Sequence, residues 1–151
     1  MAVAAGVGVF GYGATLCIDE ACCITESVTR MPTQVKLLAE LAELLNQRLP
    51  VPIERYFTED FRLDDAGAGT MLTGHAGAKA MIDHILALAP DVHYQMLDTV
   101  EAADRVAVRW RVTGTKTTGL FDVAMMAIYR FAKGRIAEDW GVWSGKPWQT
   151  C

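Results

Sequence analysis

The chain has 151 residues, of which 52% are hydrophobic and 21% are charged, and its formal net charge is −4. This length and composition predict one globular domain that forms a core without disulfide or metal cross-links. The negative charge and the scattered Lys and Arg residues argue against a nucleic-acid partner, because such a surface needs clustered basic side chains.

The first 23 residues are rich in Ala, Gly and Val and contain no Lys or Arg. The missing positive start and the repeated glycines argue against a signal peptide and a membrane span. Because Met31 precedes the first well-patterned helix, we expect residues 1–30 to be a peripheral extension and residues 31–151 to form the domain. We predict that the four cysteines are free thiols in a reducing cytoplasm; they are Cys17, Cys22, Cys23 and Cys151.

Three helices are predicted in the first half of the domain. Residues 33–47 place leucines on one helical face and charged residues opposite. Pro52 suits the first turn of a short helix that extends through Phe57. A third helix is expected from Gly74 to Ala89, because Pro90 ends its apolar pattern.

One short strand is expected at residues 61–65 after a turn at residues 58–60, and four longer strands follow the third helix. Three helices followed by an antiparallel sheet indicate the α+β class. Alternation places several large side chains on one face of these strands, and strands of that kind usually curve around a core or a pocket. The predicted lining of an apolar pocket is Tyr94, Met96, Trp110, Met125 and Trp140.

Several short motifs follow one another in a characteristic order over about residues 33–145. Residues 61–67 read FRLDDAG, residues 74–77 read GHAG at the start of the third helix, and residues 104–115 read DRVAVRWRVTGT. The last hairpin has the spacing Arg-Phe-x-x-Gly-x-Ile-x-Glu-x-Trp over residues 130–140. In this order and spacing, the chain resembles the SnoaL-like branch of the NTF2-like α+β barrel family.

The resemblance implies three N-terminal helices packed on a strongly curved, mostly antiparallel sheet, with a pocket between them and often a homodimer. The family includes polyketide cyclases, ketosteroid isomerases, scytalone dehydratases, limonene epoxide hydrolases and non-catalytic domains. We therefore expect cofactor-independent acid/base chemistry on an apolar small molecule. The alternatives are a protein that binds an apolar ligand without turnover and a purely structural dimerisation domain.

Asp65 is the first catalytic candidate, because its segment resembles ketosteroid isomerase around the general base. A carboxylate at a strand end that faces an apolar pocket would be suited to proton transfer. The partners that ketosteroid isomerase uses are missing, since the matching positions are Leu41 and Ala127. The carboxylate that often follows the tryptophan of cyclase-like members is likewise replaced, by Gly141.

Tyr129 and Glu138 are the other catalytic candidates. Tyr129 could donate a hydrogen bond to a developing oxyanion. Glu138 alternates with Trp140 and is expected to share its inward face, which would turn Asp139 to the opposite face. The histidines at positions 75, 84 and 93 do not have metal-ligand spacing, so we predict no metal and no cofactor.

Overall fold

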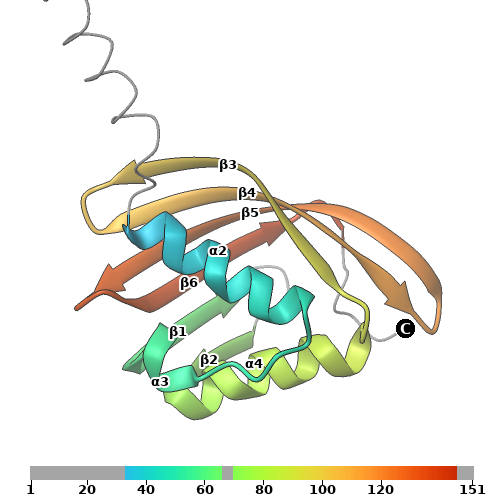
Figure 1. Cartoon of the computed structure of the whole chain (residues 1–151), viewed down its shortest axis with the longest axis horizontal. Coiled ribbons are helices and arrows are strands. Elements are labelled where there is room, and N and C mark those ends of the chain that lie inside the picture. Colours follow the sequence, from blue (N-terminus) through green and yellow to red (C-terminus); the bar gives the residue numbers. More distant parts are fainter. Residues whose placement is uncertain (1–32, 66–69, 146–151) are drawn as a thin grey trace, which may run out of the picture. The chain divides into compact units, whose positions relative to one another are not determined.

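The computed structural model describes residues 33–65 and 70–145, which belong to one compact unit. The predictions for residues 1–30 and for the four cysteines therefore lie outside the described residues. The elements, labelled in Figure 1, are α2 (Thr33–Asn46), α3 (Ile53–Tyr56), β1 (Phe57–Asp65), β2 (Thr70–Thr73), α4 (Gly74–Leu88), β3 (His93–Ala102), β4 (Arg105–Lys116), β5 (Gly119–Ala132) and β6 (Arg135–Trp143).

The three predicted helices are present at nearly the predicted positions. α2 buries Val35, Leu38, Ala42 and Leu45, as its apolar face requires. α4 begins at Gly74, whose φ of 67° favours glycine, and a side chain there would also approach the Glu59 carbonyl oxygen to 3.1 Å. The predicted turn at residues 58–60 is wrong, because the first strand begins at Phe57 and includes them.

The strands form one sheet in the order β2-β1-β6-β5-β4-β3. Every pair is antiparallel except β1 and β6, which run parallel. Figure 1 shows that the long strands curve strongly, and that α2 and α4 lie on the inner side of the curve. The expected α+β architecture is therefore confirmed.

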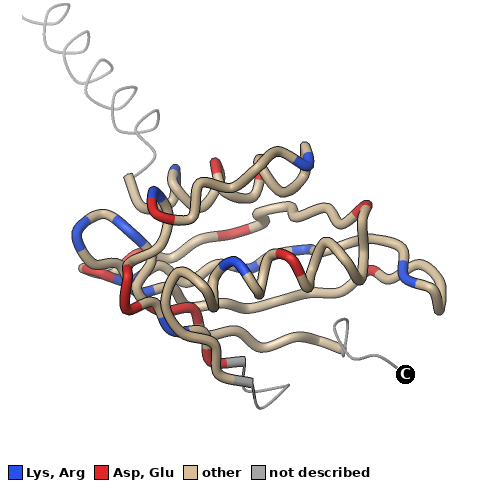
Figure 2. Tube along the Cα trace, turned by 90° about the horizontal axis from the view of Figure 1, so that it is seen from below, with Lys and Arg blue, Asp and Glu red and all other residues tan. Residues whose placement is uncertain are grey.

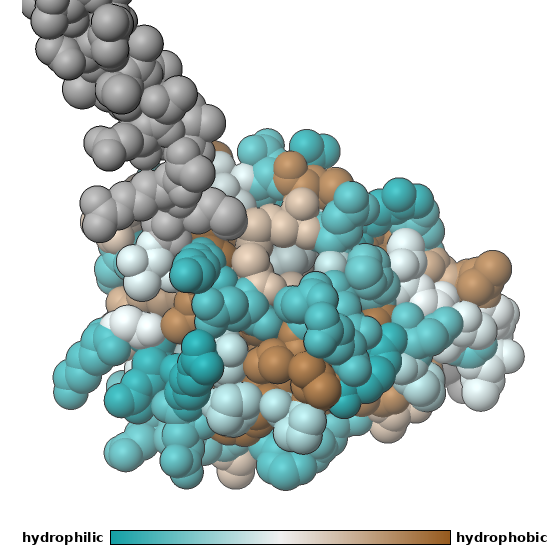
Figure 3. Space-filling model, in the orientation of Figure 1, coloured by the Kyte–Doolittle hydropathy of each residue, from teal (hydrophilic) through white to brown (hydrophobic). Residues whose placement is uncertain are grey.

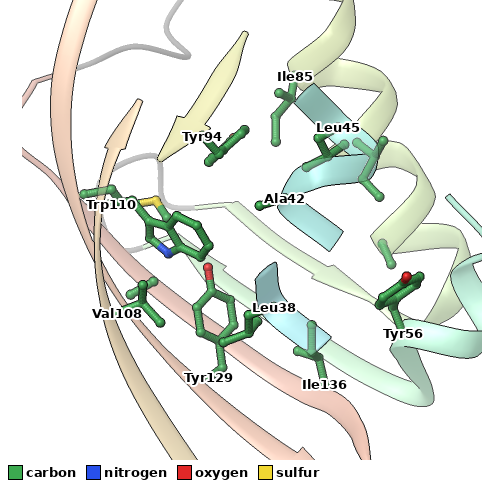
Figure 4. Packing of buried hydrophobic residues seen from close by; sticks show 14 of the residues in the cluster. Leu38, Ala42, Leu45, Tyr56, Ile85, Tyr94, Val108, Trp110, Tyr129 and Ile136 are labelled. Carbon is green, nitrogen blue, oxygen red and sulfur yellow. The ribbon is translucent and has the colours of Figure 1, made fainter. Parts of the chain in front are cut away.

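The space between the helices and the sheet contains most of the hydrophobic core. α2 contributes Leu38, Ala42 and Leu45, and α4 contributes Ile82 and Ile85. Figure 4 shows Leu38, Ala42, Leu45 and Ile85 facing inward side chains of the long strands, such as Trp110 and Tyr129, across the interior.

A β-bulge in β6 changes which side chains face inward. Arg130 pairs with Glu138, but the next residue, Phe131, pairs with Ile136, so Ala137 is the extra residue. A bulge shifts the side-chain alternation by one residue. Ile136 and Ala137 are consequently both buried, and beyond them Asp139 rather than Glu138 faces inward.

The outer face of the sheet carries exposed apolar side chains over β5 and β6. Met126 lies opposite Val142, and Ile128 lies opposite Trp140. All four are more than a third exposed. Acidic and basic residues are interspersed along the helices and strands (Figure 2). Among the described helices, none is both long enough and apolar enough to cross a bilayer.

Candidate active site

A cavity of about 440 Å³ lies between the helices and the inner face of the sheet. α2 and α4 form one wall, and the curved strands form the other. Apolar surface also interrupts the hydrophilic surface between these two helices (Figure 3). The volume falls within the range of small-molecule sites, which are concave and mostly apolar with a few polar groups.

Aromatic rings make up much of the strand side of the cavity. Each of β1, β3, β4, β5 and β6 contributes one ring to the lining, namely Phe57, Tyr94, Trp110, Tyr129 and Trp143. Tyr94 and Trp110 pack edge to face, with ring centroids 6.1 Å apart and planes at 88°. Such pairs are favourable and hold both rings in defined orientations.

Asp139 is the carboxylate that the described residues bring into this cavity. It lies directly opposite Tyr129 in the β5–β6 ladder, and both residues line the cavity. Directly opposed residues have their Cβ atoms only about 5 Å apart. The side chains of Asp139 and Tyr129 therefore start side by side on the inner face, each from a strand of the sheet.

The two cavity tyrosines are strongly perturbed. Burial is the main reason that the pKa of Tyr94 and the pKa of Tyr129 both lie above 10.0, and the negative charge of Asp139 raises each pKa further. Both phenols therefore keep their protons at neutral and moderately alkaline pH. A protonated phenol can donate a hydrogen bond to a ligand oxygen.

Trp110 presents an unusual polar atom beside Tyr129. Its indole Nε1 is buried and has no hydrogen-bond partner among the described residues. Figure 4 shows this nitrogen on the side of the ring that faces the Tyr129 hydroxyl. The approach lowers the pKa of Tyr129, which offsets part of its rise. The contact is close enough for that effect but lacks the geometry of a formed hydrogen bond.

The structure corrects the prediction that the side chains of Glu138 and Trp140 face the cavity. Glu138 does not line the cavity, and instead accepts a hydrogen bond of 2.9 Å from Arg130 on the neighbouring strand. That hydrogen bond lowers the pKa of Glu138, so this carboxylate stays ionised. Trp140 is 43% exposed on the outer face. Trp140 was expected inside as one of the large strand side chains, and Glu138 by its alternation with Trp140. The bulge at Ala137 turns both side chains to the outer face.

Other predicted pocket residues have mixed outcomes. Tyr94, Trp110 and Met125 line the cavity as expected. Met96 lies opposite Trp110 and packs half-buried against the core outside the lining, so its role in substrate binding stays a prediction. His84, from α4, does contribute to the lining.

Asp65 lies at the end of β1, where its backbone pairs with Thr70 on one side and Gly141 on the other. Its side chain is outside what the structure describes, so its catalytic role stays a prediction. Within residues 33–65 and 70–145, no cluster of three or more His, Cys, Asp or Glu side chains could hold a metal ion.

Comparison with known proteins identifies related folds. The family model of the SnoaL-like domain matches residues 38–139. Wild-type IdmH from Streptomyces antibioticus, a candidate polyketide cyclase, is 22% identical with a TM-score of 0.63, and the match covers 76% of this chain and 94% of that one. Comparison with curated proteins gives no match.

Two further solved structures are similar. A candidate SnoaL-like polyketide cyclase from Jannaschia sp. CCS1 is 17% identical with a TM-score of 0.66, over 76% of this chain and 90% of that one. A protein with a ketosteroid isomerase-like fold from Catenulispora acidiphila DSM 44928, solved with trimethylamine, is 18% identical with a TM-score of 0.63, over 74% of this chain and 88% of that one. These likenesses confirm the expected NTF2-like fold.

Proposed function

The chain belongs to the SnoaL-like domain family, and on that basis we propose that it is a small-molecule enzyme that works by cofactor-independent acid/base chemistry on a hydrophobic substrate. The reaction is of the isomerase, cyclase, dehydratase or epoxide-hydrolase type. Fold alone does not establish function, so the proposal depends on the chemistry of the cavity.

The observation that carries the proposal is the position of Asp139. This half-buried carboxylate lies on the inner face of the sheet, directly opposite Tyr129, in a cavity that is otherwise mainly apolar. An apolar cavity excludes water from the reacting groups and strengthens their electrostatic interactions. Asp139 would accept a proton from the substrate and return it to another substrate atom.

Tyr129 and Tyr94 would act with this base as hydrogen-bond donors. Their raised pKa values keep both hydroxyls protonated. A neutral donor near the reacting centre stabilises negative charge that develops on a substrate oxygen when a neighbouring proton is removed. The cavity would thus combine a base with donors for an oxyanion, although neither the Leu41 nor the Ala127 position can supply the donors expected from ketosteroid isomerase.

The test compares two adjacent carboxylates on one strand. Ligands are first found by thermal shift among steroids, terpenoids, epoxides and aromatic polyketides, because a ligand that prefers the folded state raises its melting temperature. Turnover of each hit is then measured by mass spectrometry, together with incorporation of solvent deuterium into the ligand. We expect Asp139→Asn to lower turnover by about 10²- to 10⁴-fold, while stability stays within roughly 1 kcal/mol.

Glu138→Gln is the matched control, because it removes the neighbouring carboxylate on the outer face and should leave turnover nearly unchanged. Asp65→Asn tests the earlier candidate in the same assay. If Asp139→Asn reacts at the unmodified rate and Asp65→Asn does not, the base is Asp65. If hits bind but none is converted by the unmodified chain, the acid/base proposal fails and the non-catalytic binding function gains.

A further inference from the structure

The buried indole N–H of Trp110 requires an explanation that packing alone does not provide. A buried donor without a partner is destabilising, and such groups are rare in native proteins. Trp110 is only 3% exposed, and its Nε1 has no hydrogen-bond partner among the described residues. The indole also lies on β4 in the middle of the aromatic lining, close to the Tyr129 hydroxyl.

The neighbours of Trp110 restrict how its ring can turn. Tyr94 packs against it edge to face at 88°. Met96 and Met125 lie opposite it on the two adjacent strands. The edge-to-face contact with Tyr94 favours one orientation of the indole, and in that orientation its N–H lies on the side of the Tyr129 oxygen (Figure 4).

The geometry points to Trp110 as a positioning residue: its N–H donates to the Tyr129 oxygen when a ligand binds, and so directs the Tyr129 O–H to a neutral carbonyl oxygen of that ligand. A phenol oxygen both accepts and donates, so accepting from the indole leaves its proton for a different acceptor. Linked hydrogen bonds of this kind strengthen one another. Contacts that are poorly aligned in a free enzyme often tighten in the complex.

The charge around the cavity selects a neutral acceptor rather than an anionic one. Asp139 lies opposite Tyr129 and contributes a negative charge. Among the described lining residues none is Lys or Arg, and His84 lies on the opposite wall. A carboxylate or phosphate ligand would meet repulsion from Asp139, and no Lys or Arg of the described lining would offset it. A ketone, aldehyde or ester oxygen avoids this cost.

This inference rests on the proposed function and adds a positioning residue to it. Trp110 acts through the Tyr129 hydroxyl, whereas Tyr129 itself donates to the ligand.

The experiment observes the indole N–H directly. The full chain, labelled with ¹⁵N, is titrated with 1-tetralone, and in parallel with tetralin, which has the same carbon skeleton without the oxygen. Trp110→Phe removes the N–H while keeping an aromatic ring, and identifies the Trp110 indole signal by its disappearance. We expect the ketone to move this signal downfield and tetralin to leave it nearly in place.

Affinities provide the second readout. We expect the unmodified chain to prefer the ketone over tetralin by about tenfold, in keeping with one hydrogen bond. Tyr129→Phe should abolish both the preference and the downfield movement, and Trp110→Phe should weaken the preference while tetralin binding is kept. A purely structural role for Trp110 would instead change binding of both probes equally.

Three results would overturn the inference: equal movement of the signal with both probes, a full ketone preference in Trp110→Phe, or failure of the ketone to bind. These outcomes are separable from failure of the proposed function. In Asp139→Asn the ketone-dependent movement of the Trp110 signal should persist, whatever happens to turnover.

Discussion

Replacing Asn46 by Ala tests how the helix wall of the cavity is joined to the sheet. β3 is an edge strand, so peptide groups that point away from β4 have no strand to bond. At Tyr94, the Asn46 side chain supplies the hydrogen-bond partners that a neighbouring strand would otherwise provide. Its Nδ2 donates to the Tyr94 carbonyl at 2.9 Å, and its Oδ1 accepts from the Tyr94 N–H at 2.7 Å.

The expected loss follows from these two bonds. Each partly buried hydrogen bond is worth about 1 kcal/mol net, and the Tyr94 N–H and C=O left without partners add a desolvation cost. Ala has a better helix propensity than Asn at the last residue of α2, which offsets about 0.5 kcal/mol of this loss. Asn46→Ala should therefore lower the free energy of unfolding by about 2 kcal/mol, which corresponds to a urea midpoint lower by roughly 1–2 M.

Urea unfolding followed by circular dichroism measures this change. Gln47→Ala is the control, because this amide just beyond α2 is exposed and its side chain bonds only to nearby Glu43 among the described residues. It should change stability by no more than about 0.5 kcal/mol. A loss in Asn46→Ala as small as that of the control would show that the edge of β3 does not depend on this side chain.

Three other predictions follow from the buried tyrosines, the outer face and the N-terminal segment. The folded-state pKa of Tyr94 and of Tyr129 lies above 10.0, so the unfolded chain loses these protons first, and stability should fall as pH rises beyond about 10. Thermal melts at increasing pH measure this fall. The reasoning is wrong if the melting temperature of Tyr129→Phe falls as steeply with pH as that of the unmodified chain. The homodimer expected from the family resemblance stays a prediction. If the outer face forms the interface, Trp140→Glu should lower the dimeric fraction measured by light scattering. Val100→Glu, at a 67% exposed site on β3, should leave that fraction unchanged. A chain that begins at Met31 should unfold cooperatively at nearly the temperature of the full chain, and a chain that fails to fold would refute a peripheral role for residues 1–30.

Local patterns in the sequence were sufficient for most of the architecture. The apolar spacing of residues 33–47 and 74–89 depends only on the helical period, so both helices could be placed without knowing their neighbours. Alternation did the same for β4 and β5, and therefore put Trp110, Met125 and Tyr129 on the inner face, where they line the cavity. The family motifs depend on the same local residues, which is why the NTF2-like fold could be expected.

The identity of the cavity carboxylate was decided only by tertiary structure. Counted along the strand from Ile136, alternation favours Glu138 and Trp140 as inward residues. The bulge at Ala137 is a property of how β6 pairs with β5, and the sequence of a single strand does not specify its pairing. One extra residue exchanges the two faces, so Asp139 meets Tyr129 inside the cavity while Glu138 meets Arg130 outside it.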